Sequence, residues 1–207
     1  MRIAVVANEE MKAAWMSPGL QDGTTVEWLS EPLPVQDADA YIDLDYEAAA
    51  RQPADWAFAG DLPVIINDVL KNDSSLPANF ARFNGWPSFI SRTLAEVAGN
   101  EAIREKAAAV FGAFNRTAEW VPDLPGFISA RVVCMIINEA WFSLEEEVST
   151  PGEIDTAMKL GTNYPMGPFE WGRVIGLARV YGLLDKLSQE NTRYTPANLL
   201  KKEASDL

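Results

Sequence analysis

The first 121 residues alternate short apolar runs with polar segments that carry proline, glycine or aspartate. The run at residues 2–7, R-I-A-V-V-A, is rich in β-branched side chains and is typical of a parallel strand covered on both faces. Similar runs predict further strands at residues 25–29, 40–44, 64–66, 80–86 and 118–121. A short helix is predicted at residues 10–15, and an alanine-rich helix at residues 100–114. The pattern predicts a small α/β domain at residues 1–122, with little room for crossover helices.

Helical periodicity replaces this pattern in the rest of the chain. It predicts helices at residues 127–148, 153–160, 168–189 and 195–204. A T-P-G turn at residues 150–152 separates the first two, and Pro196 suits the first position of the last helix. Residues 123–207 are therefore expected to form a second, all-helical domain.

Charge and cysteine content exclude several classes of partner. The 207 residues carry a formal net charge of −13, and their Lys and Arg residues are scattered, so nucleic acid is not expected to bind. Cys134 is the one cysteine, and Asp43 and Asp45 alternate along a strand without His or Cys nearby, so no metal site is expected. No apolar run is long enough to cross a membrane and residues 1–7 do not resemble a signal peptide, which predicts a cytoplasmic protein.

The residues after the first predicted strand do not suit a dinucleotide phosphate. A dinucleotide site needs glycines there, because the backbone turns sharply and approaches the pyrophosphate at a helix N-terminus. This chain has A-N-E-E-M at residues 7–11, without a glycine before Gly19, and two carboxylates stand where phosphate charge would lie. Glu27 or Glu31 is placed where a ribose-binding acid is expected. Dinucleotide binding in the usual manner is not expected, although a cofactor held by another route stays open.

Two segments of the helical half carry a resemblance to a known family. They are P-G-F-I-S-A-R at residues 125–131 and D-T-A-M-K-L-G-T-N-Y-P-M-G-P-F-E at residues 155–170. Together they resemble the C-terminal helical domain of 3-hydroxyacyl-CoA dehydrogenases of the 3-hydroxybutyryl-CoA dehydrogenase type. The resemblance implies a Rossmann-like N-terminal domain, here shortened, followed by a helical, 6-phosphogluconate-dehydrogenase-C-terminal-like dimerisation domain. It also implies a homodimer formed through that helical domain.

The chemistry that the resemblance implies is oxidation of a 3-hydroxyacyl-CoA by NAD, with a histidine as general base and a glutamate that orients it. Glu96 in L-A-E-V matches the glutamate. The histidine position falls on Asn84 or Pro87 of R-F-N-G-W-P, depending on where a gap is placed, and the 207 residues contain no histidine. Ala130 stands where the family usually has an Asn that helps to hold the substrate carbonyl.

A further match places two polar residues near the substrate hydroxyl. The family carries N-x-S-S after a strand, and Asn72 to Ser75 has this spelling. The family-equivalent candidates are therefore Ser74 and Glu96 for catalysis, and Asn72, Ser74, Asn84 and Glu96 for contact with substrate. No residue is assigned to a cofactor or a metal.

These observations predict a family member with weak or no dehydrogenase activity and no bound cofactor, although the family uses NAD. The alternative is a non-catalytic protein that binds an acyl-CoA or another apolar small ligand, or a dimeric scaffold. For the second motif, turn chemistry explains most of the spelling. Gly161 is expected to end a helix in a left-handed conformation, and Pro165, Gly167 and Pro168 to set a rigid turn.

Overall fold

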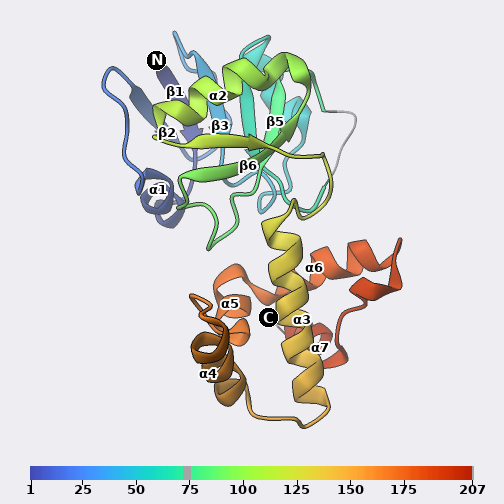
Figure 1. The fold of residues 1–207 in the computed structure, drawn as a ribbon. Helices are drawn as coiled ribbons and strands as arrows, with labels where there is room; N and C mark the ends of the chain where they lie inside the picture. The colour runs from blue at the N-terminus through green and yellow to red at the C-terminus, as the bar shows by residue number, and fades with distance from the viewer. Residues whose placement is uncertain (72–75, 207) are drawn as a thin grey trace. The chain divides into compact units, whose positions relative to one another are not determined.

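The computed structural model describes residues 1–71 and 76–206 (Figure 1). The chain divides into two compact units, Met1–Phe127 and Ile128–Leu207. The predicted change of domain after residue 122 lies five residues earlier than this division. Residues 123–127 belong to the first unit because Gly126 N donates to Val69 O at 2.8 Å and the Arg82 guanidinium binds Asp123 and the Leu124 carbonyl.

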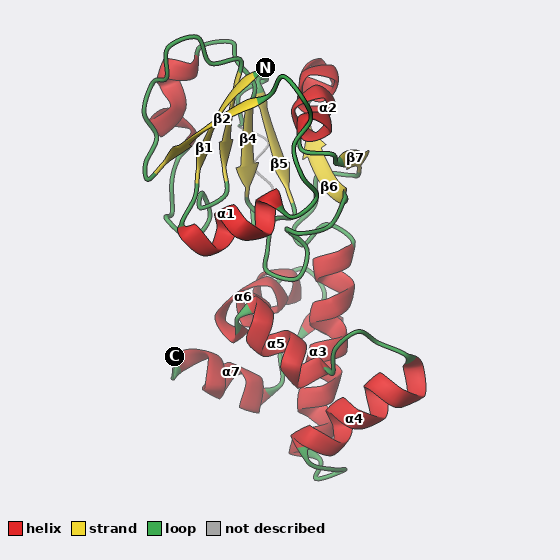
Figure 2. Cartoon of the chain, turned by 90° about the vertical axis from the view of Figure 1, so that its left-hand side faces the viewer, coloured by secondary structure: helices red, strands yellow, loops and turns green. Residues whose placement is uncertain are grey.

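The first unit contains a seven-stranded sheet within the described residues, in the order β2-β1-β3-β4-β5-β6-β7 (Figure 2). The strands are β1 (Arg2–Val6), β2 (Thr25–Leu29), β3 (Ala40–Asp43), β4 (Val64–Asn67), β5 (Phe80–Phe83), β6 (Leu94–Gly99) and β7 (Thr117–Trp120). Neighbouring strands are parallel except β5 and β6, which are antiparallel. The chain passes from β1 outward to β2 and then returns across β1 to β3. The strand order therefore reverses between β1 and β3, as it does at the ligand-binding crevice of doubly wound sheets.

Both faces of this sheet are buried, which confirms the expectation for the first strand. Ile3 and Val5 of β1 lie in one core cluster, whereas Ala4 and Val6 lie in the cluster on the opposite face. Trp15 belongs to α1 (Glu9–Met16) and packs in the first cluster with Phe111 of α2 (Arg104–Ala113), their ring centroids 6.1 Å apart. The second cluster is closed by Trp56 of the 3₁₀ helix η1 (Pro53–Ala59), and another short 3₁₀ turn, η2 (Glu101–Ile103), leads into α2.

Strand β6 was not among the predicted strands. Its burial does not alternate strictly, and Leu94 at its start is 53% exposed, so its pattern does not separate strand from loop. The strand exists because β5 pairs with it on one side and β7 on the other. The strand predicted at residues 80–86 ends at Phe83.

The second unit consists of helices. They are α3 (Ser129–Glu145), α4 (Pro151–Thr162), α5 (Pro168–Ile175), α6 (Leu177–Ser188), η3 (Thr192–Tyr194) and α7 (Asn198–Ser205). The single helix predicted at residues 168–189 is wrong, because Gly176 adopts a φ of +97° and separates α5 from α6. Cys134 is buried in α3, and burial raises the pKa of its thiol. No helix in the described part of the chain is both long and apolar enough to span a bilayer.

The second sequence motif forms the corner between α4 and α5. The buried Asp155 carboxylate of α4 accepts hydrogen bonds from Phe169 N at 2.7 Å and Glu170 N at 3.1 Å, which caps the start of α5. Lys159 binds Glu170 at 2.7 Å and helps to lower the pKa of this carboxyl group. The left-handed residue after α4 is Asn163, with a φ of 57°, and not Gly161 as the sequence suggested.

Gly167 should be irreplaceable at this corner. A Cβ at position 167 would lie 2.3 Å from the Asp155 side chain, whereas a Cβ at Gly161 meets nothing within 4 Å. Gly167→Ala is expected to lower the free energy of unfolding by at least about 2 kcal/mol, because either the capping carboxylate or the helix must move. Gly161→Ala is the matched control and should be neutral or stabilising by up to about 1 kcal/mol. Urea unfolding followed by tryptophan fluorescence measures both, and equal midpoints for the two variants would contradict the steric argument.

Candidate functional site

The first candidate region is the carboxyl ends of β1 and β3, the position at which doubly wound sheets have their ligand-binding crevice. Asn8 follows β1 and caps α1, because its side-chain Oδ1 accepts a hydrogen bond from Met11 N at 2.9 Å. Glu9 and Glu10 occupy the first turn of α1 and are exposed. The positive N-terminal end of this short helix is therefore already stabilised by the Asn8 side chain, which accepts a hydrogen bond, and by the acidic side chains of the first turn.

Asp43 lies at the β3 side of the same region. It is the last residue of β3, stands opposite Val6 in the register, and is fully buried. Its Oδ1 accepts hydrogen bonds from Asp45 N at 3.0 Å and from Arg51 Nη1 at 2.8 Å, whereas Oδ2 has no hydrogen-bond partner among the described residues. Burial raises the pKa of Asp43 to about 6, against the opposing effect of Arg51.

Asn67 joins the loops that follow β3 and β5. It is the last residue of β4 and is buried. Its Nδ2 donates to Leu44 O at 2.9 Å and Gly85 O at 3.2 Å, and its Oδ1 accepts from Gly85 N at 3.0 Å. A Cβ at Gly85 would lie 2.8 Å from the Asn67 side chain and 2.7 Å from the Phe83 ring, so only glycine leaves room for this contact.

Glu47 connects the loop after β3 to two further loops. Its Oε2 accepts hydrogen bonds from Val69 N at 2.7 Å and Leu70 N at 2.8 Å, and its Oε1 accepts from Trp86 Nε1 at 2.7 Å. Asp68 is buried next to this group, and burial together with the nearby Glu47 carboxylate raises the pKa of Asp68 to about 6. The loops after β3, β4 and β5 are thus tied by charged and amide side chains.

Arg82 of β5 completes this network and is fully buried. Its guanidinium binds Asp123, donates to Asp68 O at 2.9 Å and Leu124 O at 2.7 Å, and lies 4.3 Å from the Phe127 ring centroid. All of these partners are in its own unit. The arginine of the R-F motif is therefore a structural cation in this chain.

Asn84 and Glu96, two of the predicted site residues, are brought together by the antiparallel pair β5–β6. The register sets Phe83 opposite Val97, so the next residues along the ladder are also opposed. Asn84 N donates to Glu96 O at 3.0 Å, and the Asn84 Nδ2 donates to Glu96 Oε2 at 3.0 Å. Asn84 is buried, and its Oδ1 has no partner within residues 1–71 and 76–206. Pro87 has a ring that can neither donate nor accept, so Asn84 is the residue whose side chain meets this carboxylate.

The other predicted site residues, Asn72 and Ser74, lie outside the described residues. Sequence reasoning did not single out Glu47, Asn67 or Asp68, and considered Asp43 only as half of an acidic pair. A signal was present, because each of these polar residues stands at or just after the carboxyl end of a parallel strand.

A dinucleotide bound in the usual manner does not fit the residues at the carboxyl ends of β1 and β3. Its pyrophosphate needs free backbone amides on a glycine turn. Here one first-turn amide is occupied by Asn8, no glycine lies between β1 and α1, and Glu9 and Glu10 are in the first turn of that helix. Glu27, one of the two suggested ribose-binding acids, is paired instead with Arg2 at 2.6 Å.

A Rossmann-like sheet in one unit and an all-helical second unit are the architecture of the chain. The whole chain aligns with (S)-3-hydroxybutyryl-CoA dehydrogenase from Ralstonia eutropha, with a TM-score of 0.75 and 17% identity over 99% of this chain and 93% of that one. The structure of 3-hydroxybutyryl-CoA dehydrogenase from Escherichia coli aligns with a TM-score of 0.60 and 29% identity, over 68% of this chain and 31% of that one.

Sequence comparison identifies the helical unit more narrowly. Residues 126–206 match the family model for the 3-hydroxyacyl-CoA dehydrogenase C-terminal domain. The chain is 39% identical over 115 residues to 3-hydroxyadipyl-CoA dehydrogenase of Escherichia coli, covering 54% of this chain and 24% of that protein. It is 38% identical over 115 residues to a probable 3-hydroxybutyryl-CoA dehydrogenase of Bacillus subtilis, covering 53% of this chain and 40% of that protein. The helical unit belongs to the family of 3-hydroxyacyl-CoA dehydrogenase C-terminal domains, and the chain spans about a quarter to two fifths of the length of these two relatives.

The buried carboxyl group of Asp43 should make stability depend on pH. Its pKa is about 6 in the folded chain against an ordinary value of 3.8, so the folded state binds this proton more tightly than the unfolded state. The stabilisation is fully present below about pH 4 and is lost as the pH rises through 6. Asp43→Asn removes this titration. The free energy of unfolding of the wild type minus that of Asp43→Asn should therefore increase by roughly 2 kcal/mol from pH 7 to pH 4.

Urea unfolding at constant ionic strength measures this difference. Arg51→Gln is a matched variant, because it removes the cation that lowers the pKa of Asp43, and it should move the transition to higher pH. If the free energy of unfolding depends on pH in the same way for the wild type and Asp43→Asn, burial does not raise the pKa of Asp43.

Proposed function

We propose that this chain is a 3-hydroxyacyl-CoA dehydrogenase relative with weak or no dehydrogenase activity. The observation that carries the proposal is the 3.0 Å hydrogen bond from Asn84 Nδ2 to Glu96 Oε2. The family reaction needs an imidazole beside this glutamate to accept the substrate's hydroxyl proton. A carboxamide cannot accept and hold a proton at neutral pH, and loss of a general base typically costs a factor of about 10² to 10⁴ in rate.

The residues at the carboxyl ends of β1 and β3 also argue against binding of NAD in the family's usual manner. Carboxylates at positions 9 and 10 lie where the two phosphates of NAD would be seated, and no glycine lies between β1 and α1. Both carboxylates are exposed, so water screens their repulsion, and the stronger obstacle is the absence of a glycine turn whose amides could receive the pyrophosphate. NAD is therefore not bound in the family's usual manner.

Two measurements test this proposal on the purified chain. Titration with NADH, followed by nicotinamide fluorescence, should show no saturable binding in the micromolar range. Incubation with (S)-3-hydroxybutyryl-CoA and NAD should give turnover at or below about one thousandth of that of an active relative measured in parallel. Saturable NADH binding would contradict the argument from the missing glycine turn, and turnover at an ordinary rate would contradict the argument from Asn84.

The variant Asn84→His distinguishes the effect of the missing general base from the effect of the missing phosphate-binding loop. The backbone ladder should place the imidazole beside Glu96, whose carboxylate is expected to raise the imidazole pKa above its ordinary value of about 6.5. NMR can follow this titration without interference, because the chain has no other histidine. The variant should still show no turnover, because the chain still lacks a glycine turn that could bind the phosphates of NAD. Activity in this variant would show that only the base was missing.

A second candidate function is binding of a small acyl ligand, and one observation favours it. Asn84 Oδ1 is a buried acceptor without a partner in the described part of the chain, and such atoms are costly unless a ligand or water satisfies them. A hydroxyl group of a bound ligand is a suitable donor, with Glu96 holding the amide in place.

Calorimetric titration with (S)-3-hydroxybutyryl-CoA tests this binding without requiring turnover. Asn84→Leu keeps the shape of the side chain but removes the acceptor, so it should weaken binding by about tenfold. Gln21→Leu makes the same chemical change at an exposed position and is the control. Equal affinities for wild type and Asn84→Leu would assign the polar pair a purely structural role.

A further inference from the structure

Residues 123–127 are the last segment of the first unit, and we call this segment the joint. Arg82 of β5 fastens it to the sheet, because the guanidinium forms an ion pair with Asp123 and donates to Leu124 O at 2.7 Å. Arg82 is fully buried, whereas the Asp123 side chain is 38% exposed. The attachment of the joint therefore depends on a buried cation whose partners lie nearer the surface.

The backbone of the joint is strained. Gly126 has a φ of +82° and Phe127 a φ of +49°. The left-handed region is open to glycine, but it is rare and costly for a bulky residue such as phenylalanine. The Phe127 ring is buried and lies 4.3 Å from the Arg82 guanidinium. This packing holds the strained residue in place, so loss of the Arg82 contacts would let the backbone relax.

The loop that follows β4 connects the joint to the rest of the carboxyl edge. Val69 O accepts a hydrogen bond from Gly126 N at 2.8 Å, whereas Val69 N donates to Glu47 Oε2 at 2.7 Å. Asp68 O accepts from Arg82 Nη1 at 2.9 Å. This short loop thus contacts the joint and Glu47 together, and a change in the loop reaches the joint directly.

The Asp68 side chain is a buried acid within this loop. Its Oδ1 accepts a hydrogen bond from Lys71 N at 3.1 Å. Charged groups act on it from three places: Glu47 in the loop after β3, Arg82 in β5, and Lys71 in its own loop. Asp123 of the joint binds the same Arg82. Three carboxylates and two cations therefore share this cluster, and burial makes the ionised form of Asp68 costly.

We propose that proton binding by Asp68 controls whether the joint is closed on the first unit or released from it. In the closed state burial raises the pKa of Asp68 to about 6, whereas a solvated aspartate has a value of 3.8. The closed state therefore binds the proton more tightly, and its added stability is fully present below about pH 4 and is lost as the pH rises through 6. Release of residues 123–127 would add up to about 17 Å of free chain before the second unit.

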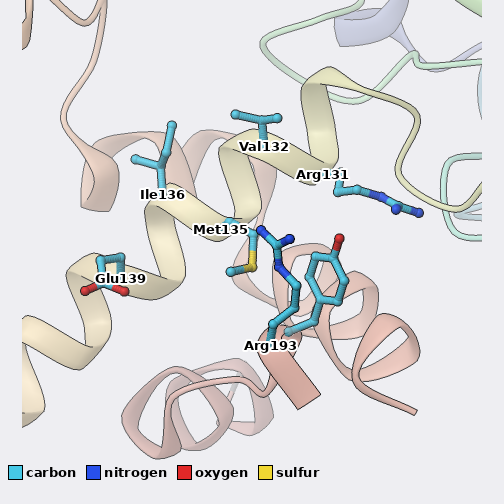
Figure 3. Close-up of a pocket in the computed structure, with 7 residues that line it drawn as sticks. Arg131, Val132, Met135, Ile136, Glu139 and Arg193 are labelled. Carbon is cyan, nitrogen blue, oxygen red and sulfur yellow. The ribbon is translucent and has the colours of Figure 1, made fainter. Parts of the chain in front are cut away.

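Charged side chains also gather in a pocket of about 460 Å³ in the second unit (Figure 3). Arg131, Arg193 and Glu139 line it together with apolar side chains. Arg193 and Glu139 are exposed, so water screens their charges, and opposite signs in one pocket favour neither an anion nor a cation. The cluster at Asp68 differs because it is buried and is bonded to a strained segment.

Hydrogen exchange of backbone amides, followed by NMR, measures release of the joint. The ratio of the intrinsic to the observed exchange rate at each pH is a protection factor. For Gly126 N and Val69 N it should fall roughly tenfold from pH 5 to pH 7. Asp68→Asn keeps an oxygen that can accept from Lys71 N but has no titrating carboxyl group, so its protection factors should not depend on pH. Asp43→Asn removes a carboxyl group with the same pKa of about 6 and is the matched control, which should keep the tenfold fall.

Asp123→Asn tests the other side of the cluster. It removes the ion pair with Arg82, so the protection factor of Gly126 N should fall by about tenfold at both pH values, with their ratio unchanged. Ile65 N in the central strand β4 reports global unfolding and should stay better protected than Gly126 N in every variant. The proposal is overturned if wild-type Gly126 N is equally protected at pH 5 and pH 7, or if its pH response survives in Asp68→Asn. Exchange of Gly126 N only together with Ile65 N, or an unchanged protection factor in Asp123→Asn, would also contradict it.

Discussion

The carboxyl edge of the parallel sheet is held together by polar side chains that satisfy the backbone of neighbouring loops. Loops at this edge cannot hydrogen-bond within the sheet, so their amides need other acceptors. Glu47 serves two amides and an indole, Asn67 serves the backbone at Leu44 and Gly85, and Arg82 binds three groups from two segments. This edge is where related folds place a ligand. In this chain much of its hydrogen-bonding capacity is used internally.

The pairing of positions 84 and 96 is set by the backbone of the sheet and not by the chemistry of either side chain. Positions 84 and 96 are opposed because β5 and β6 form an antiparallel ladder, and the main-chain bond between them does not depend on either side chain. An amide at position 84 keeps a hydrogen bond to Glu96 without the capacity to take a proton. The helical unit likewise keeps its family motif because Asp155, Gly167 and Glu170 form a corner that the packing requires. Retention of that motif therefore reports architecture and carries no information about turnover.

Periodicity and turn residues in the sequence correctly predicted the features of the fold that depend on short-range interactions. The doubly buried strand β1, the helical second half and the turn-rich corner at Gly167 all follow from periodicity and from proline and glycine placement. Strand β6 could not be found this way, because its pairing with β5 and β7 creates it. The break at Gly176 was missed because a lone glycine is tolerated in many helices. At the site, the family resemblance selected Asn84 and Glu96, but the roles of Glu47 and Asn67 depend on loops that meet only in the folded chain.

The chain lacks the side chain that ordinarily changes charge near pH 6, yet two buried carboxyl groups occupy that range. Asp43 and Asp68 both have pKa values of about 6, and both lie at the carboxyl edge of the sheet. Ordinary surface carboxylates stay ionised at this pH. Mild acidification therefore neutralises these two carboxylates while the acidic exterior of the protein keeps its charge, so the local electric field at this edge can be changed by protons alone.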